Sequence, residues 1–344
     1  MAQMFLKVLI IMIVLFAFMV PGFALKKLKM AGEGSTLILS NILLYVCQPA
    51  LSIKAFCVFT DEAWELILNM NKLTLLANFG IVAAISFLAM IIMALICKLI
   101  FIKSKNRKET DIYSFVAIFS NCSFLGVPFI EMFTDGDPLA VMYVMVFSVV
   151  LVILCWTLGV VLVTGDVKKI KFKKVICNPA IITSVLGIII FFVPQINIFM
   201  MNGLKELQIL PQYLAYMAAP VSMIIVGIRL ADMKVKDIFC KKGAYLAGSL
   251  RLILAPLIAF GISLLFYLLL VNTRGAISGS DEYIILAPVI AMAMSPAATV
   301  VAMADRFDGD RETATSVFVN NTLISIITIP LIIMAIMALW GVIV

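Results

Sequence analysis

The chain has 344 residues, of which 64% are hydrophobic and 13% charged, and its mean hydropathy is +1.18. A soluble domain of this length has too few interior positions to bury so many apolar side chains, so the composition excludes a soluble protein and indicates several membrane-spanning helices. The formal net charge is +7, but the basic residues lie in short clusters between apolar runs, which favours membrane orientation over nucleic-acid binding.

Histidine is absent, which removes imidazole metal ligands, His-based catalytic triads and histidine proton relays. The cysteines lie mostly in or beside apolar runs and form no C-x-x-C motif, so they predict buried thiols and neither a disulfide framework nor a zinc site. The chain also lacks a nucleophile motif and a pair of deep carboxylates, so we expect no enzyme, no cofactor and no metal. The seven cysteines are Cys47, Cys57, Cys97, Cys122, Cys155, Cys177 and Cys240.

Ten apolar runs follow one another along the chain, and each predicts one transmembrane helix, since about 20 helical residues cross the hydrocarbon core. Lys7 precedes the apolar stretch from Val8 to Val20, as in a signal peptide, but the stronger basic cluster at 26–29 follows it, so we predict a spanning helix there. The ten runs cover 5–25, 35–58, 73–102, 112–133, 139–163, 176–193, 210–231, 243–271, 282–304 and 314–343.

The basic residues support ten spans with both termini outside the cell. Of the 26 Lys and Arg residues, twenty then lie in the cytoplasmic connections and five in the outer ones, and Arg251 remains within the eighth run. This bias follows the positive-inside rule, so we predict a multi-pass protein of the plasma membrane. Arg251 lies close to the cytoplasmic end of its run, and we expect its long side chain to reach that face.

The fourth run carries polar residues at its centre, in the stretch S-N-C-S-F-L-G-V-P-F-I from 120 to 130. Pro128 cannot donate a backbone hydrogen bond, and its ring crowds the carbonyl group of Phe124. In hydrocarbon such an interruption persists only where protein or a water-lined cavity covers it. The amide of Asn121 must also find a partner there. The stretch therefore predicts a broken helix and a binding site.

The ninth run holds a second interruption, A-M-A-M-S-P-A-A-T from 291 to 299, in which Pro296 leaves the carbonyl group of Met292 without its helical donor. If the two broken helices cross at their prolines, their exposed N–H groups can hold a carboxylate without a cationic side chain. For the glycine and the prolines, close helix packing is the alternative explanation. The predicted substrate-binding residues are Gln48, Asn121, Ser123, Gly126, Pro128, Ser295, Pro296 and Thr299.

The two halves of the chain carry prolines at matching places, and inverted repeats with broken helices at matching places are typical of secondary transporters. We therefore predict an all-α integral membrane fold of ten helices in two inverted five-helix repeats, 1–163 and 176–344. A basic cytoplasmic linker, 164–175, joins them, and we expect its lysines to contact lipid phosphates. The matching pairs are Pro49 with Pro220, at an offset of 171 residues, and Pro128 with Pro296, at 168.

At these residues the chain resembles the auxin efflux carrier family of membrane transport proteins. The motif N-x-x-x-x-G-V-P, from Asn121 to Pro128, is similar to the broken fourth helix of that family. The stretch from Ser295 to Val317 is similar to its ninth helix and the following loop. Further similar stretches are Asn178-Pro179, Ala219 to Leu230 and Thr322 to Pro330. The resemblance covers essentially the whole chain.

The resemblance implies that helices 1, 2, 6 and 7 form a scaffold, while helices 3–5 and 8–10 form a moving transport unit. It also implies that helices 4 and 9 cross at Pro128 and Pro296, and that Asn121 faces the substrate carboxylate. Substrates of the family are small organic anions: auxin in plants, and malonate- or malate-like dicarboxylates in bacterial members. The short linker of this chain resembles the bacterial type.

We expect a secondary transporter of small organic anions, such as malonate, malate or auxin-like acids, that works by alternating access. The lipid bilayer and a second copy of the chain are further candidate partners. Two alternatives stay open: a sodium-coupled carrier of a related crossover fold, and a membrane receptor that does not transport. No deep carboxylate or histidine indicates proton coupling, and a sodium site made of backbone carbonyls leaves no trace in a sequence, so the coupling ion stays open too.

Overall fold

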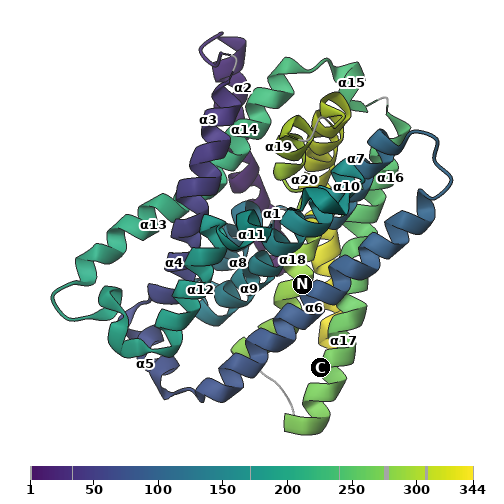
Figure 1. The fold of residues 1–344 in the computed structure, drawn as a ribbon. Helices are drawn as coiled ribbons and strands as arrows, with labels where there is room; N and C mark the ends of the chain where they lie inside the picture. Colours follow the sequence, from purple (N-terminus) through teal and green to yellow (C-terminus); the bar gives the residue numbers. More distant parts are fainter. Residues whose placement is uncertain are drawn as a thin grey trace.

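The computed structural model describes residues 2–32, 34–170, 172–239, 241–274, 279–306 and 309–343. Within these ranges all regular structure is helical, and no β-strand forms (Figure 1). Seven of the described helices are long and apolar enough to cross a membrane. This confirms an all-helical fold typical of an integral membrane protein, while the division into two inverted repeats stays a prediction.

Each of the ten apolar runs is mostly helical in the described part of the chain, and consecutive helices such as α3 and α4 join into single spans. The helices of the first half are α1 (Ala2–Ala17), α2 (Met19–Lys27), α3 (Ser35–Ile42), α4 (Gln48–Cys57), α5 (Asp61–Asn69), α6 (Lys72–Ile100), α7 (Arg107–Ile118), α8 (Val127–Phe133), α9 (Pro138–Leu154), α10 (Val160–Thr164) and α11 (Phe172–Ile176). Those of the second half are α12 (Pro179–Phe192), α13 (Ile209–Tyr216), α14 (Ala218–Asp232), α15 (Val235–Phe239), α16 (Lys242–Ser249), α17 (Ala255–Arg274), α18 (Tyr283–Ala293), α19 (Thr299–Arg306) and α20 (Arg311–Ile343).

Wide π-helical turns interrupt three of the spans shortly before a proline. Proline has no N–H group, so the α-helical bond to the fourth preceding carbonyl is missing there. A π-helical turn, in which each bond reaches one residue farther, keeps the helix continuous in spite of the missing donor. The turns and their prolines are Leu43–Cys47 with Pro49, Cys122–Gly126 with Pro128, and Leu250–Leu254 with Pro256.

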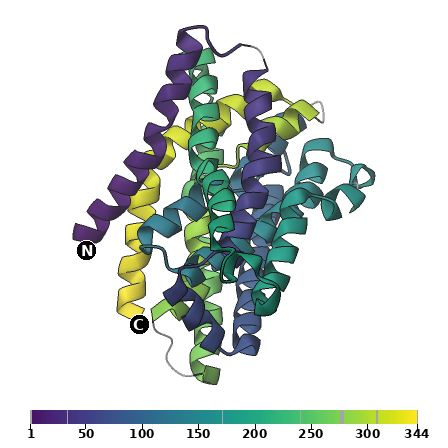
Figure 2. The same cartoon turned by 90° about the vertical axis from the view of Figure 1, so that its left-hand side faces the viewer.

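The helices pack as two groups of neighbours. In one group α2 lies along α14, and α4 packs against α12 and α13. In the other, α6, α9, α17 and α18 pack on one another, and α16 packs against α7 and α20. Contacts of α1 with α20 and of α4 with α9 connect the groups. Figure 2 shows α1 beside α20, with both chain ends toward the same end of the molecule.

The contact between α2 and α14 is made by the backbone. Gly22 lies against the carbonyl oxygen of Ile224, and Gly227 lies against that of Met19, so neither glycine leaves room for a Cβ atom. Small residues allow this close approach between helices in membranes, where packing replaces the hydrophobic effect as the cause of association. We therefore expect α2 and α14 to behave as one rigid pair.

Candidate functional site

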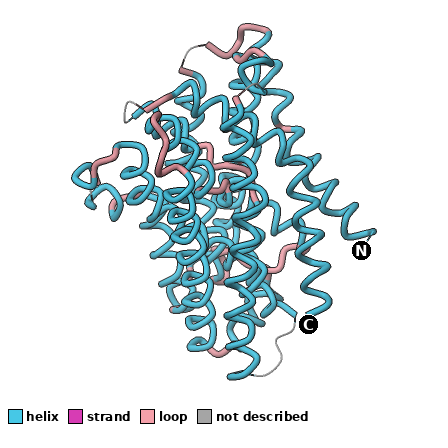
Figure 3. Tube along the Cα trace, turned by 90° about the vertical axis from the view of Figure 1, so that its right-hand side faces the viewer, coloured by secondary structure: helices cyan, strands magenta, loops and turns pink. Residues whose placement is uncertain are grey.

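Two interrupted helices meet inside the bundle. The chain leaves helical geometry directly after α7 and again between α18 and α19, and Figure 3 shows short loop segments within the bundle as well as at its ends. The main-chain N–H of Asn121 donates to the carbonyl oxygen of Ser295 at 2.7 Å. The amide of Ala297 donates to the carbonyl oxygen of Phe119 at 2.9 Å. We call this contact the crossing, and it is made by main-chain atoms.

The first break lies earlier in the chain than the sequence predicts. The helix that follows it, Cys122–Phe133, continues through Pro128, because the π-helical turn accommodates the missing donor. The prediction that the helices cross at Pro128 is therefore wrong. They cross where an antiparallel bridge joins Ser120 to Pro296, so only the second of the two prolines lies at the crossing.

The crossing brings together four helix ends: the N-termini at Cys122 and Thr299, and the C-termini at Ile118 and Ala293. The first N–H groups of a helix have no acceptor within it, and the last carbonyl groups have no donor. The N-termini therefore carry partial positive charge and the C-termini partial negative charge. An anion is favoured at one pair of ends and a cation at the other.

Arg251 covers the two C-termini, so the prediction that its side chain reaches the cytoplasmic face is wrong. The side chain is 0% exposed. It donates to the carbonyl oxygens of Ala117 at 3.2 Å and Ile118 at 2.9 Å, and also to that of Met292. These carbonyls are available because both helices stop at the crossing, which leaves their last turn without the usual donors.

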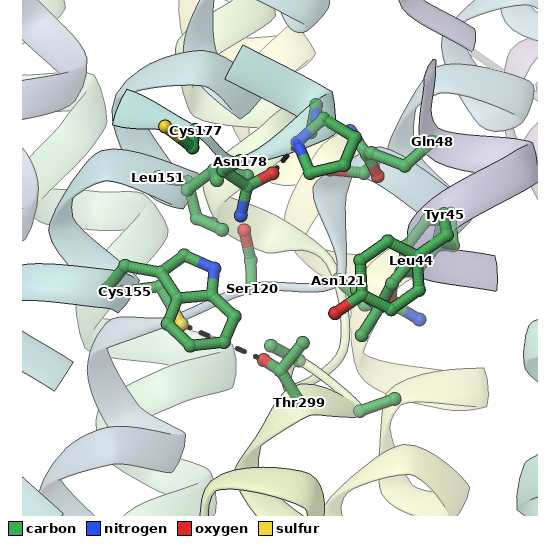
Figure 4. A pocket seen from close by; sticks show the side chains of 18 of the residues that line it. Leu44, Tyr45, Gln48, Ser120, Asn121, Leu151, Cys155, Cys177, Asn178 and Thr299 are labelled. Carbon is green, nitrogen blue, oxygen red and sulfur yellow. Dashed lines mark hydrogen bonds between the residues drawn. The ribbon is translucent and has the colours of Figure 1, made fainter. Parts of the chain in front are cut away.

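A pocket of about 530 Å³ lies at the two N-termini. Its wall is formed by the crossing, by the first turn of Cys122–Phe133 and of α19, and by parts of α4, α9 and α12 with the π-helical turns beside them. Figure 4 shows Tyr45 and Asn121 on one side of the pocket, Cys155 on the other, and Thr299 between them. Lys173 is the one charged residue among the described residues that line it.

A chain of side-chain hydrogen bonds fixes the polar wall of this pocket. The amide nitrogen of Gln48 donates to the hydroxyl of Ser148 at 3.4 Å, and that hydroxyl lies 2.5 Å from the hydroxyl of Ser123. The side-chain nitrogen of Asn121 donates to the hydroxyl of Ser222 in α14 at 3.3 Å. All five residues are buried, so these bonds satisfy their polar groups and hold the two side-chain amides in place.

The structure brings four of the eight predicted binding residues to the pocket wall: Gln48, Asn121, Ser123 and Thr299. The other four lie next to it. Gly126 faces the side chain of Met294, Pro128 continues its helix, Ser295 accepts the Asn121 amide, and Pro296 forms the bridge. Ser295 and Pro296 form part of the crossing, whereas Gly126 and Pro128 lie in the helix that follows the first break. Substrate contact by any of the eight stays a prediction.

The sequence did not predict most of the other lining residues, among them Tyr45, Trp156 and Lys173. Tyr45 carries a usable signal, because it lies three residues before Gln48 and therefore on the same helical face. Trp156 lies in a π-helical turn that contains no proline to reveal it. Lys173 comes from the linker, whose lysines were expected at lipid phosphates. Its position at the pocket could not be read from the charge pattern.

A second cavity of about 920 Å³, which we call the vestibule, adjoins the pocket. Its cationic residues belong, like the linker, to the connections predicted to be cytoplasmic, so we call this side of the pocket the linker side. The vestibule is basic, with three cationic residues and one carboxylate, Asp232, which pairs with Lys26 at 3.1 Å. The vestibule therefore offers an electrostatically favourable path for anions toward the pocket. The residues common to both cavities are Leu44, Tyr45, Trp156 and Thr299. The cationic residues are Lys26, Arg229 and Arg311.

An ion pair joins α4 and α8 near the C-terminal ends of these helices. Lys54 of α4 lies 2.5 Å from both carboxylate oxygens of Glu131 in α8, and its ammonium group lies 4.2 Å from the ring centre of Tyr216. Lys54 is 11% exposed and Glu131 is 27% exposed. Since α4 belongs to the first packing group and α8 packs against α9 of the second, the pair joins the two groups in a partly buried position.

A model of one protein family, described as membrane transport protein, matches residues 7–333. The matched segment contains both interrupted helices, Arg251 and every residue that lines the pocket. No curated protein matches the chain. The family match thus extends over nearly the whole length and includes the entire candidate site.

Proposed function

The chain belongs to the membrane transport protein family, and we propose that it is a secondary transporter of small organic anions that works by alternating access. It is a multi-pass membrane protein with several apolar helices. We further propose that it resides in the plasma membrane with both termini outside, because twenty of its Lys and Arg residues then lie in cytoplasmic connections.

The observation that carries the proposal is the pocket at two converging helix N-termini. Helix N-termini bind carboxylates and phosphates through their free N–H groups and their partial positive charge. Asn121 adds amide donors, and Ser123 and Thr299 add hydroxyl donors. The described lining residues include no Asp or Glu that would repel an anion. These features together favour a carboxylate over a cation.

The apolar part of the pocket limits the size and polarity of the substrate. Leu44, Leu151 and Trp156 face the same space as the polar groups. A pocket of about 530 Å³ suits a compact ligand, since ligand pockets of roughly 300–1,000 Å³ hold small molecules up to drug size. We therefore propose mono- or dicarboxylates with a short carbon skeleton, such as malonate or malate, as substrates.

The arrangement of cavities supports an alternating-access cycle. The pocket adjoins the basic vestibule on the linker side, and in the proposed cycle the Lys54–Glu131 pair closes the other side. This is the geometry expected of a carrier that is open toward one side only. Because α4 and α8 belong to different packing groups, a movement of one group against the other would break the pair and open that side.

The first test is a thermal-shift screen of the purified protein against mono- and dicarboxylates, followed by uptake of the best ligand into proteoliposomes. A ligand that binds the folded state raises its thermal stability. We expect short carboxylates to stabilise the protein and amines of similar size to have no effect. Comparing uptake into proteoliposomes with uptake into vesicles without the protein distinguishes a transporter from a receptor, since a receptor binds the anion without moving it.

The matched variants are Asn121→Ala and Asn69→Ala. Removing the Asn121 amide should weaken carboxylate binding about ten- to a hundredfold, since a hydrogen bond to a charged group contributes about 1.5–3 kcal/mol. Asn69 lies exposed at the end of α5, so its variant should bind like the wild type. Equal affinities for the two variants, or stabilisation by amines alone, would contradict the proposal.

A further inference from the structure

Arg251 is a formal charge inside an apolar bundle. Its side chain lies in the π-helical turn Leu250–Leu254 and is the largest of the fully buried side chains. Removing a charge from water costs several kcal/mol unless other groups compensate it. Among the described residues, none of the ion pairs includes Arg251. The compensation must come from acceptors other than a carboxylate.

The acceptors are three backbone carbonyl oxygens at the C-termini of α7 and α18. Arg251 donates to those of Ala117, Ile118 and Met292. The carbonyl of Met292 has no helical donor, because the residue four positions later, Pro296, lacks an N–H group. The carbonyl of Ala117 lacks its helical donor too, because the main-chain N–H of Asn121 donates to the carbonyl oxygen of Ser295 instead. The crossing itself creates this set of acceptors.

Backbone carbonyls at the C-termini of half-helices are the groups that coordinate sodium in carriers with broken helices. They combine oxygen ligands, which hard cations prefer, with the negative end of the helix dipole. In this chain a guanidinium group already donates to these oxygens. We propose that Arg251 takes the place of a coupling cation, so that the protein binds and moves its anion without co-transported sodium.

The charges at the crossing support this assignment, which rests on the proposed function. Each helix terminus carries about half an elementary charge, so the two N-termini and the two C-termini together cancel. Arg251 adds one full positive charge, which a guanidinium keeps at any physiological pH. The crossing thus has a net charge that a single carboxylate in the adjacent pocket can balance. Without Arg251 a mobile cation would have to supply it.

The experiment compares uptake of radiolabelled malonate, or of the best carboxylate from the screen, in sodium chloride and in N-methylglucamine chloride. We expect equal initial rates for the wild-type protein in the two media. Arg251→Gln should lose at least about tenfold in sodium-free uptake, since a charged hydrogen-bond donor contributes about 1.5–3 kcal/mol. Added sodium or guanidinium should restore part of that loss, because both can enter the vacated carbonyl set.

Two further variants separate charge from folding. Arg251→Lys keeps the charge but loses the planar fork, so we expect intermediate, sodium-independent uptake. Lys98→Gln removes one charge from an exposed position at the end of α6 and should behave like the wild type. If Arg251→Gln fails to fold, the wild-type comparison and Arg251→Lys still decide.

Each outcome has a distinct meaning. A wild-type protein that transports the anion only with sodium overturns the role of Arg251 and leaves the anion carrier intact. Unchanged sodium-free uptake by a folded Arg251→Gln variant overturns it as well. A wild-type protein that binds no carboxylate in either medium contradicts the proposed function itself. If added sodium restores part of the uptake of Arg251→Gln and leaves the uptake of Lys98→Gln unchanged, the result supports the proposal that the Arg251 side chain takes the place of a cation.

Discussion

The two sides of the crossing are built from different chemistry. On the linker side, the pocket and the vestibule meet at Tyr45 and Trp156, where uncharged side chains separate two cavities. Near the C-terminal ends of α4 and α8, Lys54 and Glu131 bind each other. The linker side thus presents mainly uncharged and cationic side chains to two cavities, whereas the charges of Lys54 and Glu131 neutralise each other. In the proposed cycle, this ion pair is what keeps the second side closed.

The energy of that pair makes it suited to a reversible closure. A solvent-exposed ion pair contributes about 0–1 kcal/mol, whereas breaking a buried pair costs about 3–5 kcal/mol. Lys54 and Glu131 are partly buried, so their contribution lies between these limits. In the proposed cycle, an interaction of this strength can hold one side closed and still break when the pocket is occupied.

The largest effect is expected when one charge of the Lys54–Glu131 pair is reversed. Glu131→Lys places two cations together at a partly buried position, which should open or unfold the closed side and reduce uptake by at least about tenfold. The double swap Lys54→Glu with Glu131→Lys should regain most of the uptake. Initial uptake rates and thermal unfolding of the purified variants measure both effects.

The exposed pair of Lys205 with Asp61 provides the control, since their side chains are 37% and 72% exposed. Asp61→Lys should leave uptake nearly unchanged, as surface ion pairs contribute little. If the single and double variants of the Lys54–Glu131 pair are equally impaired, the pair does not close that side.

A smaller effect is expected at Tyr45, where the pocket meets the vestibule. Tyr45→Ala should widen the contact between pocket and vestibule and admit longer carboxylates. We expect the preference for a three-carbon over a five-carbon dicarboxylate to fall by about tenfold, roughly the discrimination that contacts to one methylene group give in a pocket. Competition of the two acids for uptake measures this preference. Tyr213→Ala, which removes an exposed tyrosine of α13, is the control and should keep the wild-type preference.

The smallest effect is expected at the linker. Lys173 lines the pocket but is exposed, so salt screens its charge. Lys173→Gln should raise the apparent KM for the anion by about two- to threefold at low ionic strength, and the difference should vanish near 1 M salt. Lys169→Gln removes a neighbouring charge that does not line the pocket and should show neither change. A salt-independent loss in Lys173→Gln would indicate a direct bond to the substrate instead of steering.

The sequence predicts the helical runs and the existence of both breaks, because these depend on local properties. Apolar length determines which segments can span a membrane, and polar residues beside prolines mark where a helix is interrupted. The position of the first break does not follow from such local properties. Pro128 removes one donor, and a π-helical turn can accommodate that loss without ending the helix. The competing response, a full break, occurs seven residues earlier, at Asn121.

Contacts between distant residues account for what the sequence could not give. Residue type and the neighbouring prolines together predicted Asn121, Ser123 and Gln48, since amides and hydroxyls in hydrocarbon require partners. Glu131 pairs with Lys54, which lies 77 residues away in the chain, and Arg251 donates to the carbonyl of Met292, which lies 41 residues away. No periodicity or motif encodes such pairs, and an intramembrane arginine near a helix end is compatible with either snorkelling or burial.

The main-chain bridge between Ser120 and Pro296 has a consequence for the history of such proteins. Hydrogen bonds between peptide groups do not depend on which side chains flank them, so mutations around the joint can alter cargo preference while the joint itself persists. A lineage can therefore change its cargo without passing through an unfolded intermediate.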